Sequence, residues 1–198
     1  SSRGVDRAQF SPAHRDAAVR AEFGLAPDQP MVLYVGRLAA EKNLDLLLEA
    51  WRQLGPRDDD PRLVLVGAGP LEAELQTATP PGVLIAGVRT GLALGACYAS
   101  ADLFAFPSST ETFGNVLLEA MSSGVASLAV NAGGVTDFAE HNVNAWMVEP
   151  DSSAALTDGL RRLLDDRALR RRLAAGGEAM AASRDWKSIL TGVLQEYE

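Results

Sequence analysis

The segment at residues 107–121, PSSTETFGNVLLEAM, carries two carboxylates, Glu111 and Glu119, on either side of a glycine and an asparagine. If every step from 111 to 119 were helical, the carboxylates would lie about 12 Å apart along the axis, at ~1.5 Å per residue. A carboxylate pair that cleaves one glycosidic bond needs a separation of roughly 5 to 9.5 Å. Because a carboxylate accepts hydrogen bonds from vicinal sugar hydroxyls, the spacing favours two groups that bind different parts of one extended ligand, one a transferred hexose and the other a ribose. For Glu119 an ordinary helix-surface glutamate is the alternative.

Two cations, Arg37 and Lys42, stand on either side of a short turn in GRLAAEKN, residues 36–43. A guanidinium binds phosphate oxygens in a bidentate way and an ammonium acts as a point charge, so the two together suit a diphosphate. The alternative is that both are ordinary surface cations. Gly114 and Asn115 are expected at a helix N-terminus, where free backbone N–H groups and the helix dipole favour a negative group.

These residues need a scaffold, and short apolar runs predict one. Runs of this length are typical of buried strands of a parallel sheet, and they lie at residues 31–35, 62–66, 82–86, 102–106, 125–130 and 145–148. In the helical pattern that follows the first run, one face is apolar, formed by Leu44, Leu47, Leu48 and Trp51. Parallel strands joined by helices require crossovers, so we expect an α/β fold with a Rossmann-like, doubly wound parallel sheet of about six strands. After Ser152 the leucine spacing predicts two or three further helices without strands.

Glycines follow five of the expected strands, in GRLAAEKN, GAGP, GVRTG, PSSTETFGN and NAGG. Ligands of open parallel sheets bind outside the carboxyl ends of the strands, and a glycine lets a ligand approach the backbone closely. One such motif alone is more typical of a tight turn. The coincidence at five strand ends favours a ligand site there, with a nucleoside base held through backbone groups at residues 87–89.

Composition excludes several classes of function. A formal charge of −8 argues against a nucleic-acid surface, and the basic run RALRRRL at 167–173 is interpreted as a solvent-facing helix surface. The single cysteine, Cys97, cannot form an internal disulfide and is expected to be a core residue of a protein in a reducing compartment. No stretch approaches the roughly 18 apolar residues of a membrane span, so we expect a cytoplasmic protein, peripheral to a membrane at most.

The motifs RGVDRAQFSP, VGRLAAEKN, LVGAGP, ASADLFAFPSSTETFGNVLLEAM and NAGG, in this order, resemble the C-terminal, nucleotide-sugar-binding half of a GT-B glycosyltransferase of retaining family 4, also called group 1. The resemblance runs almost end to end. It implies hexose transfer from a UDP- or GDP-linked sugar without a metal or other cofactor. TETFGNVLLEAM is similar to mannosyl and sulfoquinovosyl transferases, which implies a lipid or glycan acceptor.

The resemblance also assigns roles to residues. It implies that Glu111 contacts the donor sugar, that Arg37 and Lys42 contact the diphosphate, and that Glu119 contacts the ribose. We expect further donor contacts from Gly36, Gly67, Gly69, Val88, Arg89, Thr112, Phe113, Gly114, Asn115 and Val116. The chain departs from the usual family pattern at Asn43, Ala126 and Thr136, none of which carries a charge used above.

The implied domain division places an interdomain linker at 1–12, the donor-binding domain at 13–180 and a helix at 181–198 that crosses toward an absent N-terminal, acceptor-binding domain. Without that domain, donor binding but no turnover is expected. A sugar-nucleotide epimerase and a non-catalytic nucleotide-sugar-binding module remain alternatives. An oxidoreductase would need G-x-G-x-x-G after its first strand, and a P-loop enzyme would need GK[ST]; the chain has neither.

Overall fold

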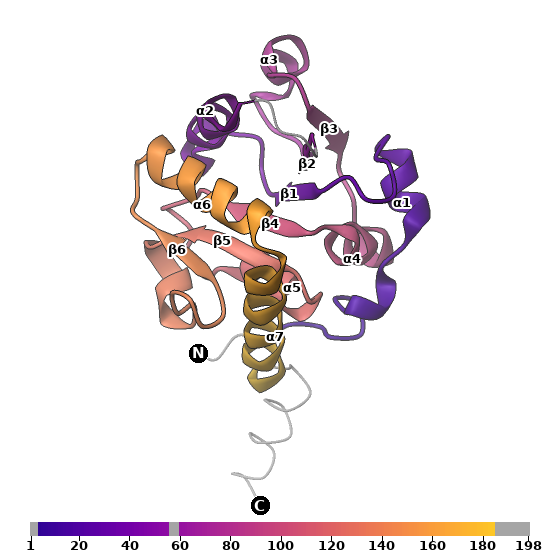
Figure 1. The fold of residues 1–198 in the computed structure, drawn as a ribbon, viewed down its shortest axis with the longest axis vertical. Helices are drawn as coiled ribbons and strands as arrows, with labels where there is room; N and C mark the ends of the chain where they lie inside the picture. Colours follow the sequence, from indigo (N-terminus) through magenta and orange to yellow (C-terminus); the bar gives the residue numbers. More distant parts are fainter. Residues whose placement is uncertain (1–3, 56–59, 185–198) are drawn as a thin grey trace, which may run out of the picture.

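The computed structural model describes residues 4–55 and 60–184, which form a parallel sheet covered by helices on both faces (Figure 1). The sheet order is β3-β2-β1-β4-β5-β6, and every neighbouring pair is parallel. The strands are β1 Met31–Val35, β2 Arg62–Val66, β3 Val83–Gly87, β4 Leu103–Phe106, β5 Ala126–Val130 and β6 Trp146–Val148. The expected six-stranded parallel sheet is therefore confirmed, to within a residue or two at each strand end.

Seven α-helices connect or cover the strands within the described part of the chain: α1 Ala17–Glu22, α2 Leu44–Leu54, α3 Glu72–Ala78, α4 Gly91–Ser100, α5 Asn115–Ser122, α6 Ser153–Asp165 and α7 Arg167–Ser183. Short 3-10 turns lie at η1 Pro12–His14, η2 Ala40–Lys42 and η3 Gly133–Asp137. Of the helices expected after Ser152, α6 and α7 are present. The helix expected around residues 186–197 lies outside the described residues.

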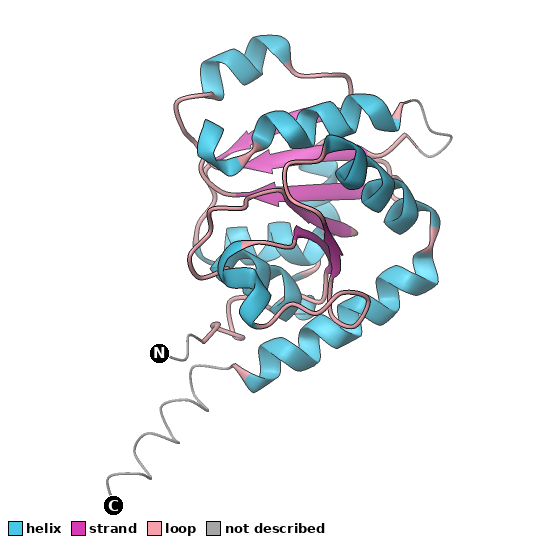
Figure 2. Ribbon diagram, turned by 90° about the vertical axis from the view of Figure 1, so that its left-hand side faces the viewer, coloured by secondary structure: helices cyan, strands magenta, loops and turns pink. Residues whose placement is uncertain are grey.

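Alternation along the strands divides the core into two layers. In β1, Val32 and Tyr34 pack on α2 and α6, whereas Met31, Leu33 and Val35 face the layer that holds α4 and α5. Figures 1 and 2 show these helices on opposite sides of the sheet. All four predicted apolar residues of α2 are buried, and each such side chain contributes about 1.5 to 3 kcal/mol. Cys97 is also buried, as predicted, and burial raises the pKa of its thiol to about 11.

The N-terminal segment contacts the end of α7 and the helix α4. Val5 donates its N–H to the carbonyl of Arg184, just past α7, at 3.0 Å, and the ring of Phe10 meets Tyr98 edge-on at 5.6 Å between centroids. α7 lies next to this segment in Figure 1.

Candidate functional site

Loops at the carboxyl ends of the strands are tied to one another by hydrogen bonds. The Leu38 N–H donates to Ala68 at 3.0 Å, which joins the loop after β1 to the loop after β2. The Thr110 hydroxyl donates to the Glu41 carbonyl at 2.9 Å. The Gly134 N–H donates to the Glu111 carbonyl at 2.7 Å. The loops after β1, β2, β4 and β5 thus form one cross-linked surface, as the sequence predicts for residues that share one edge of the sheet.

The glycines of the first two loops permit this cross-linking. A Cβ on Gly67, which has φ of 145°, would lie 1.9 Å from the Gly36 carbonyl oxygen, and a Cβ on Gly69 would lie 2.3 Å from that of Leu38. No side chain fits at either position. The close approach in this structure is between two loops, so these glycines have a structural reason that is separate from the ligand approach expected from the sequence.

Lys42 and Glu111 come together at the centre of this surface, although they are far apart in the chain. The Lys42 ammonium (Nζ) lies 2.9 Å from Glu111 Oε2, and the two side chains are only 22% and 23% exposed. Partial burial reduces solvent screening, so this pair is electrostatically stronger than a surface pair of equal length. The sequence predicts both residues for the site but assigns them to different parts of the ligand.

Arg37 instead pairs with Glu41, which the sequence reading did not single out. The guanidinium lies 3.0 Å from Glu41 Oε1, and the side chains are 61% and 49% exposed. The Arg37 backbone is held from below, because the buried Tyr34 hydroxyl donates to its carbonyl at 2.9 Å. Burial, followed by the charges of Glu111 and Glu41, raises the pKa of Tyr34, so the hydroxyl keeps its proton and remains a donor.

Asn43, a departure from the family pattern, anchors the residue next to Lys42. Its backbone is left-handed, with φ of 54°, a conformation that asparagine tolerates better than most residues. Its side-chain amide donates to the Pro107 carbonyl and to the Ser109 hydroxyl, each at 3.2 Å. Asn43 therefore fixes the loop that carries Lys42 to the loop that carries Glu111.

α5 begins where the sequence predicts it. Gly114 is the N-cap, with φ of 65°, and a Cβ there would lie 2.9 Å from the Phe138 ring. Asn115 and Thr112 are exposed, Val116 is half-buried against the core and Phe113 is 42% exposed. The helix N-terminus opens beside Glu111, so a negative group there would meet backbone N–H groups.

Glu119 lies further along α5 and is not the freely solvated glutamate of the alternative interpretation. Its Oε2 accepts a hydrogen bond from the Tyr98 hydroxyl at 2.9 Å. Burial raises the pKa of Glu119, and the Tyr98 hydrogen bond partly opposes the increase. Tyr98 is fully buried in α4. Sequence reasoning missed it, because α4 (GLALGACYAS) is apolar all round and shows no polar face that would single out one hydroxyl.

The loop after β3 carries one exposed apolar residue and one arginine that forms an ion pair. Val88 is 64% exposed. Arg89 donates to Glu22 at 2.6 Å, and its guanidinium lies 5.5 Å from the centre of the Phe23 ring. The hydrogen bond to Glu22 raises the pKa of Arg89. In this structure Arg89 is directed toward α1 and is not brought together with Lys42 and Glu111.

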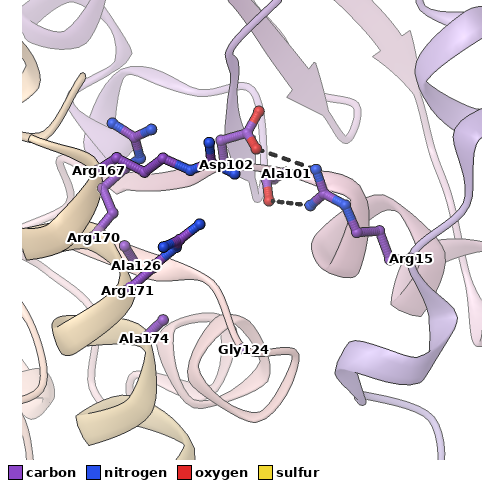
Figure 3. A pocket seen from close by; sticks show the side chains of 9 residues that line it. All are labelled: Arg15, Ala101, Asp102, Gly124, Ala126, Arg167, Arg170, Arg171 and Ala174. Carbon is purple, nitrogen blue, oxygen red and sulfur yellow. Dashed lines mark hydrogen bonds and ion pairs between the residues drawn. The ribbon is translucent and has the colours of Figure 1, made fainter. Parts of the chain in front are cut away.

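A cavity of about 280 Å³ lies at the other end of the sheet (Figure 3). Arg15 donates there to the carbonyls of Ala99 and Ala101 and pairs with Asp102 at 3.2 Å. Arginines of α7 approach from the opposite side. The prediction of a solvent-facing basic run is wrong for one of them, because Arg170 is half-buried and donates to the last carbonyls of α6, among them that of Leu164 at 2.8 Å.

Two features are absent from the described residues. They contain no group of three or more His, Cys, Asp or Glu side chains placed to hold a metal ion. No helix among them is both long and apolar enough to cross a membrane. A metal-free site remains a prediction.

Comparison with known proteins gives consistent matches. Residues 16–180 match the family model of glycosyl transferases group 1. Sulfoquinovosyl transferase SQD2 of Arabidopsis thaliana is 32% identical over 200 residues, covering 98% of this chain and 38% of that protein. A GDP-mannose-dependent alpha-mannosyltransferase of Corynebacterium glutamicum is 34% identical over 197 residues, covering 99% of this chain and 46% of that protein. The chain thus spans less than half the length of either relative.

Among solved structures, Anabaena Alr3699/HepE in complex with UDP-glucose superimposes with a TM-score of 0.83 at 25% identity, covering 98% of this chain and 55% of that one. The sheet and the helices around it are therefore shared with a nucleotide-sugar complex over nearly the whole chain.

Proposed function

Because the chain belongs to the glycosyl transferases group 1 family, we propose that it is the donor-binding part of a retaining GT-B glycosyltransferase of family 4. The full protein transfers a hexose from a nucleotide-diphosphate sugar to an acceptor. No metal takes part. Of the alternatives, nothing in the comparisons favours an epimerase, since the relatives described above are named as transferases.

The juxtaposition of Lys42 and Glu111 carries this proposal. A nucleotide sugar presents a strongly anionic diphosphate next to a neutral, hydroxyl-rich ring. A site for it needs a cation and a hydroxyl acceptor side by side, and Lys42 Nζ lies 2.9 Å from Glu111 Oε2. The N-terminus of α5 opens beside this pair and supplies further donors to phosphate oxygens.

The ribose is assigned to Glu119. The Tyr98 hydroxyl occupies one carboxylate oxygen of Glu119 and holds the side chain in place. A carboxylate has room for further donors, such as the two ribose hydroxyls. The base then lies toward the exposed Val88 after β3, where an apolar side chain and backbone groups are available.

Transfer with retention develops negative charge on the leaving phosphate. Fixed positive groups stabilise that charge without having to reorganise. Lys42, Arg37 and the α5 N-terminus are these groups, and Asn43 and Tyr34 hold the backbone that carries the two cations. Glu111 orients the hexose through its hydroxyls while the bond to phosphate breaks.

The donor carries either uridine or guanosine. The Anabaena structure, 25% identical to this chain, contains UDP-glucose, and the Corynebacterium relative, 34% identical, is named as GDP-mannose-dependent. The acceptor is a lipid or a glycan, bound by an N-terminal domain across the cleft. Residues 1–12 link the two domains, 13–180 bind the donor, and 181–198 reach toward the partner domain. This chain alone therefore binds donor without turnover.

Titration calorimetry of the chain with UDP, GDP, ADP and NAD tests the proposal. We expect UDP or GDP to bind and NAD not to bind. Binding of NAD in preference to UDP and GDP would contradict it, as would the absence of binding by every nucleotide. Turnover in the full protein, measured as release of nucleoside diphosphate that depends on an acceptor, separates the transferase from a non-catalytic binding module.

A further inference from the structure

The two cations assigned to the diphosphate each pair with a carboxylate, which is unexpected for a surface that receives an anion. Arg37 pairs with Glu41 at 3.0 Å and Lys42 with Glu111 at 2.9 Å. Each cation thus already has a carboxylate counter-ion. An incoming diphosphate must compete with these carboxylates for the cations and is repelled by them.

The two pairs differ in how strongly they compete. Both partners of the Arg37–Glu41 pair are about half exposed or more, at 61% and 49%. Solvent and salt screen such a pair, and its partners separate at little cost. Lys42 and Glu111 are 22% and 23% exposed, so their interaction and the repulsion between Glu111 and phosphate are screened less.

Movement of the loops cannot easily separate Lys42 from Glu111. Asn43 fixes the loop next to Lys42 to Pro107 and Ser109. The carbonyl of Glu111 is held by the Gly134 N–H at 2.7 Å. The carboxylate therefore stays near the phosphate position whether or not a hexose is present.

We infer that Glu111 discriminates the nucleotide sugar from the nucleoside diphosphate that remains after transfer. This inference rests on the proposed function. With a hexose present, sugar hydroxyls donate to the Glu111 carboxylate and offset its repulsion of the diphosphate. Without the hexose, Glu111 retains Lys42 as its partner and repels the phosphates. The carboxylate thus favours substrate over product and promotes product release.

The test compares affinities for UDP, UDP-glucose, GDP and GDP-mannose in the wild-type chain and in Glu111→Gln. Glutamine keeps the shape and removes the charge. We expect the affinity for the bare nucleotide that binds to increase about fivefold. The affinity for the corresponding nucleotide sugar should decrease, so the affinity for the nucleotide sugar relative to that for the bare nucleotide falls. Unchanged or weaker nucleotide binding by Glu111→Gln would overturn the inference.

Two matched variants isolate the effect. Glu41→Gln removes the charge of the screened pair and should change nucleotide affinity less than twofold. Glu49→Gln removes a carboxylate of the same exposed kind, paired with Arg52 within α2, and should change nothing. Equal increases in all three variants would show a general charge effect and would also overturn the inference.

A double-mutant cycle covers the case in which Glu111→Gln alters the local structure. In the Lys42→Gln background the gain from Glu111→Gln should be smaller, since no cation remains to be released. An equal gain in both backgrounds would contradict the role of the pair. If the wild-type chain binds none of the four ligands, the proposed function itself fails, a result that differs from every outcome above.

Discussion

The two ends of the sheet each carry a cluster of charged residues, and the clusters differ in how many contacts each charged group makes. At the amino end, Asp102 accepts from Arg15, from Arg20 and from the Met31 N–H. Arg20 is buried and also donates to three carbonyls, those of Pro27, Gln29 and Ser100. At the carboxyl end, the ion pairs of Lys42 and Arg37 are single contacts. A cluster in which each group makes several contacts holds segments together, whereas one with single contacts retains capacity for a ligand.

This difference cannot be seen in the composition of the clusters. Each combines arginine or lysine with one or two carboxylates. The amino-end cluster ties the N-terminal segment and α1 to the start of β4, and the cavity in Figure 3 lies beside it. Loss of a residue at this end should affect stability, and loss at the other end should affect nucleotide binding.

The largest effect is expected for Arg20→Met. The substitution removes one of the three donors to Asp102 and the guanidinium that donates to three carbonyl oxygens. Loss of one partner of a buried, hydrogen-bonded pair should lower the free energy of unfolding by about 3 kcal/mol. Urea denaturation measures this change. Arg37→Met is the control, because an exposed pair contributes only about 0 to 1 kcal/mol. Equal destabilisation by the two substitutions would remove the distinction between the ends.

Lys42→Ala should weaken ligand binding and leave stability almost unchanged. The variant loses a charge-assisted contact with the diphosphate, so nucleoside diphosphate binding weakens by about 1 to 3 kcal/mol, while uridine or guanosine binds as before. Calorimetry with nucleoside and nucleotide measures both, and urea denaturation should show little change. An equal loss for nucleoside and nucleotide would refute the phosphate assignment.

Glu119→Gln sharpens the comparison, because Glu119 combines features of both ends: it is partly buried, yet it is assigned to the ligand. Loss of the charged acceptor should weaken nucleoside, nucleotide and nucleotide sugar alike, by about 1 to 2 kcal/mol. The free energy of unfolding at neutral pH should instead increase. Burial raises the folded-state pKa of Glu119, so its contribution to stability is present below the unfolded pKa and is lost as pH rises through the folded pKa.

The glutamine variant should therefore be more stable than the wild-type chain at neutral pH, with the gain disappearing in acid. Melting temperatures at several pH values measure this. Weaker nucleoside binding with no gain in stability at neutral pH would mean that burial of the carboxylate carries no cost.

Local patterns were sufficient to predict the scaffold. Apolar runs such as 31–35 and 62–66 became strands because parallel strands covered on both faces need continuous apolar sequence. The helix start at Gly114 followed from a glycine before an apolar period. The placement of the candidate site residues at one edge of the sheet followed from the rule that ligands of parallel sheets bind at the carboxyl ends of the strands.

The contacts within the site could not be predicted in the same way. Lys42 and Glu111 are 69 positions apart and pair only because β1 and β4 are neighbours in the sheet. The role of Gly67 depends on its distance from Gly36, which no local motif encodes. Asn43 was a departure from a pattern and became an anchor. Pairing across the sheet, rather than local propensity, determines these partners.

The smallest expected effect belongs to Tyr98→Phe, which removes one hydroxyl and leaves the ring in the core. The Tyr98 hydroxyl donates to Glu119 at 2.9 Å and lowers the pKa that burial raises. Without it the pKa of Glu119 rises further, so the carboxylate becomes protonated at a higher pH and loses acceptor capacity for the ribose. Nucleoside binding should weaken by about 0.5 to 1.5 kcal/mol in the pH range where Glu119 is protonated in the variant and still ionised in the wild-type chain. The pH below which nucleoside affinity falls should move upward. In the Glu119→Gln background, Tyr98→Phe should leave the pH dependence of affinity unchanged.

Titrations with nucleoside across a pH series for the two single variants and the double variant measure these shifts. If Tyr98→Phe lowers affinity equally at every pH, the hydroxyl acts on packing alone, and Glu119 resembles the structural amino-end cluster more than the ligand-binding end.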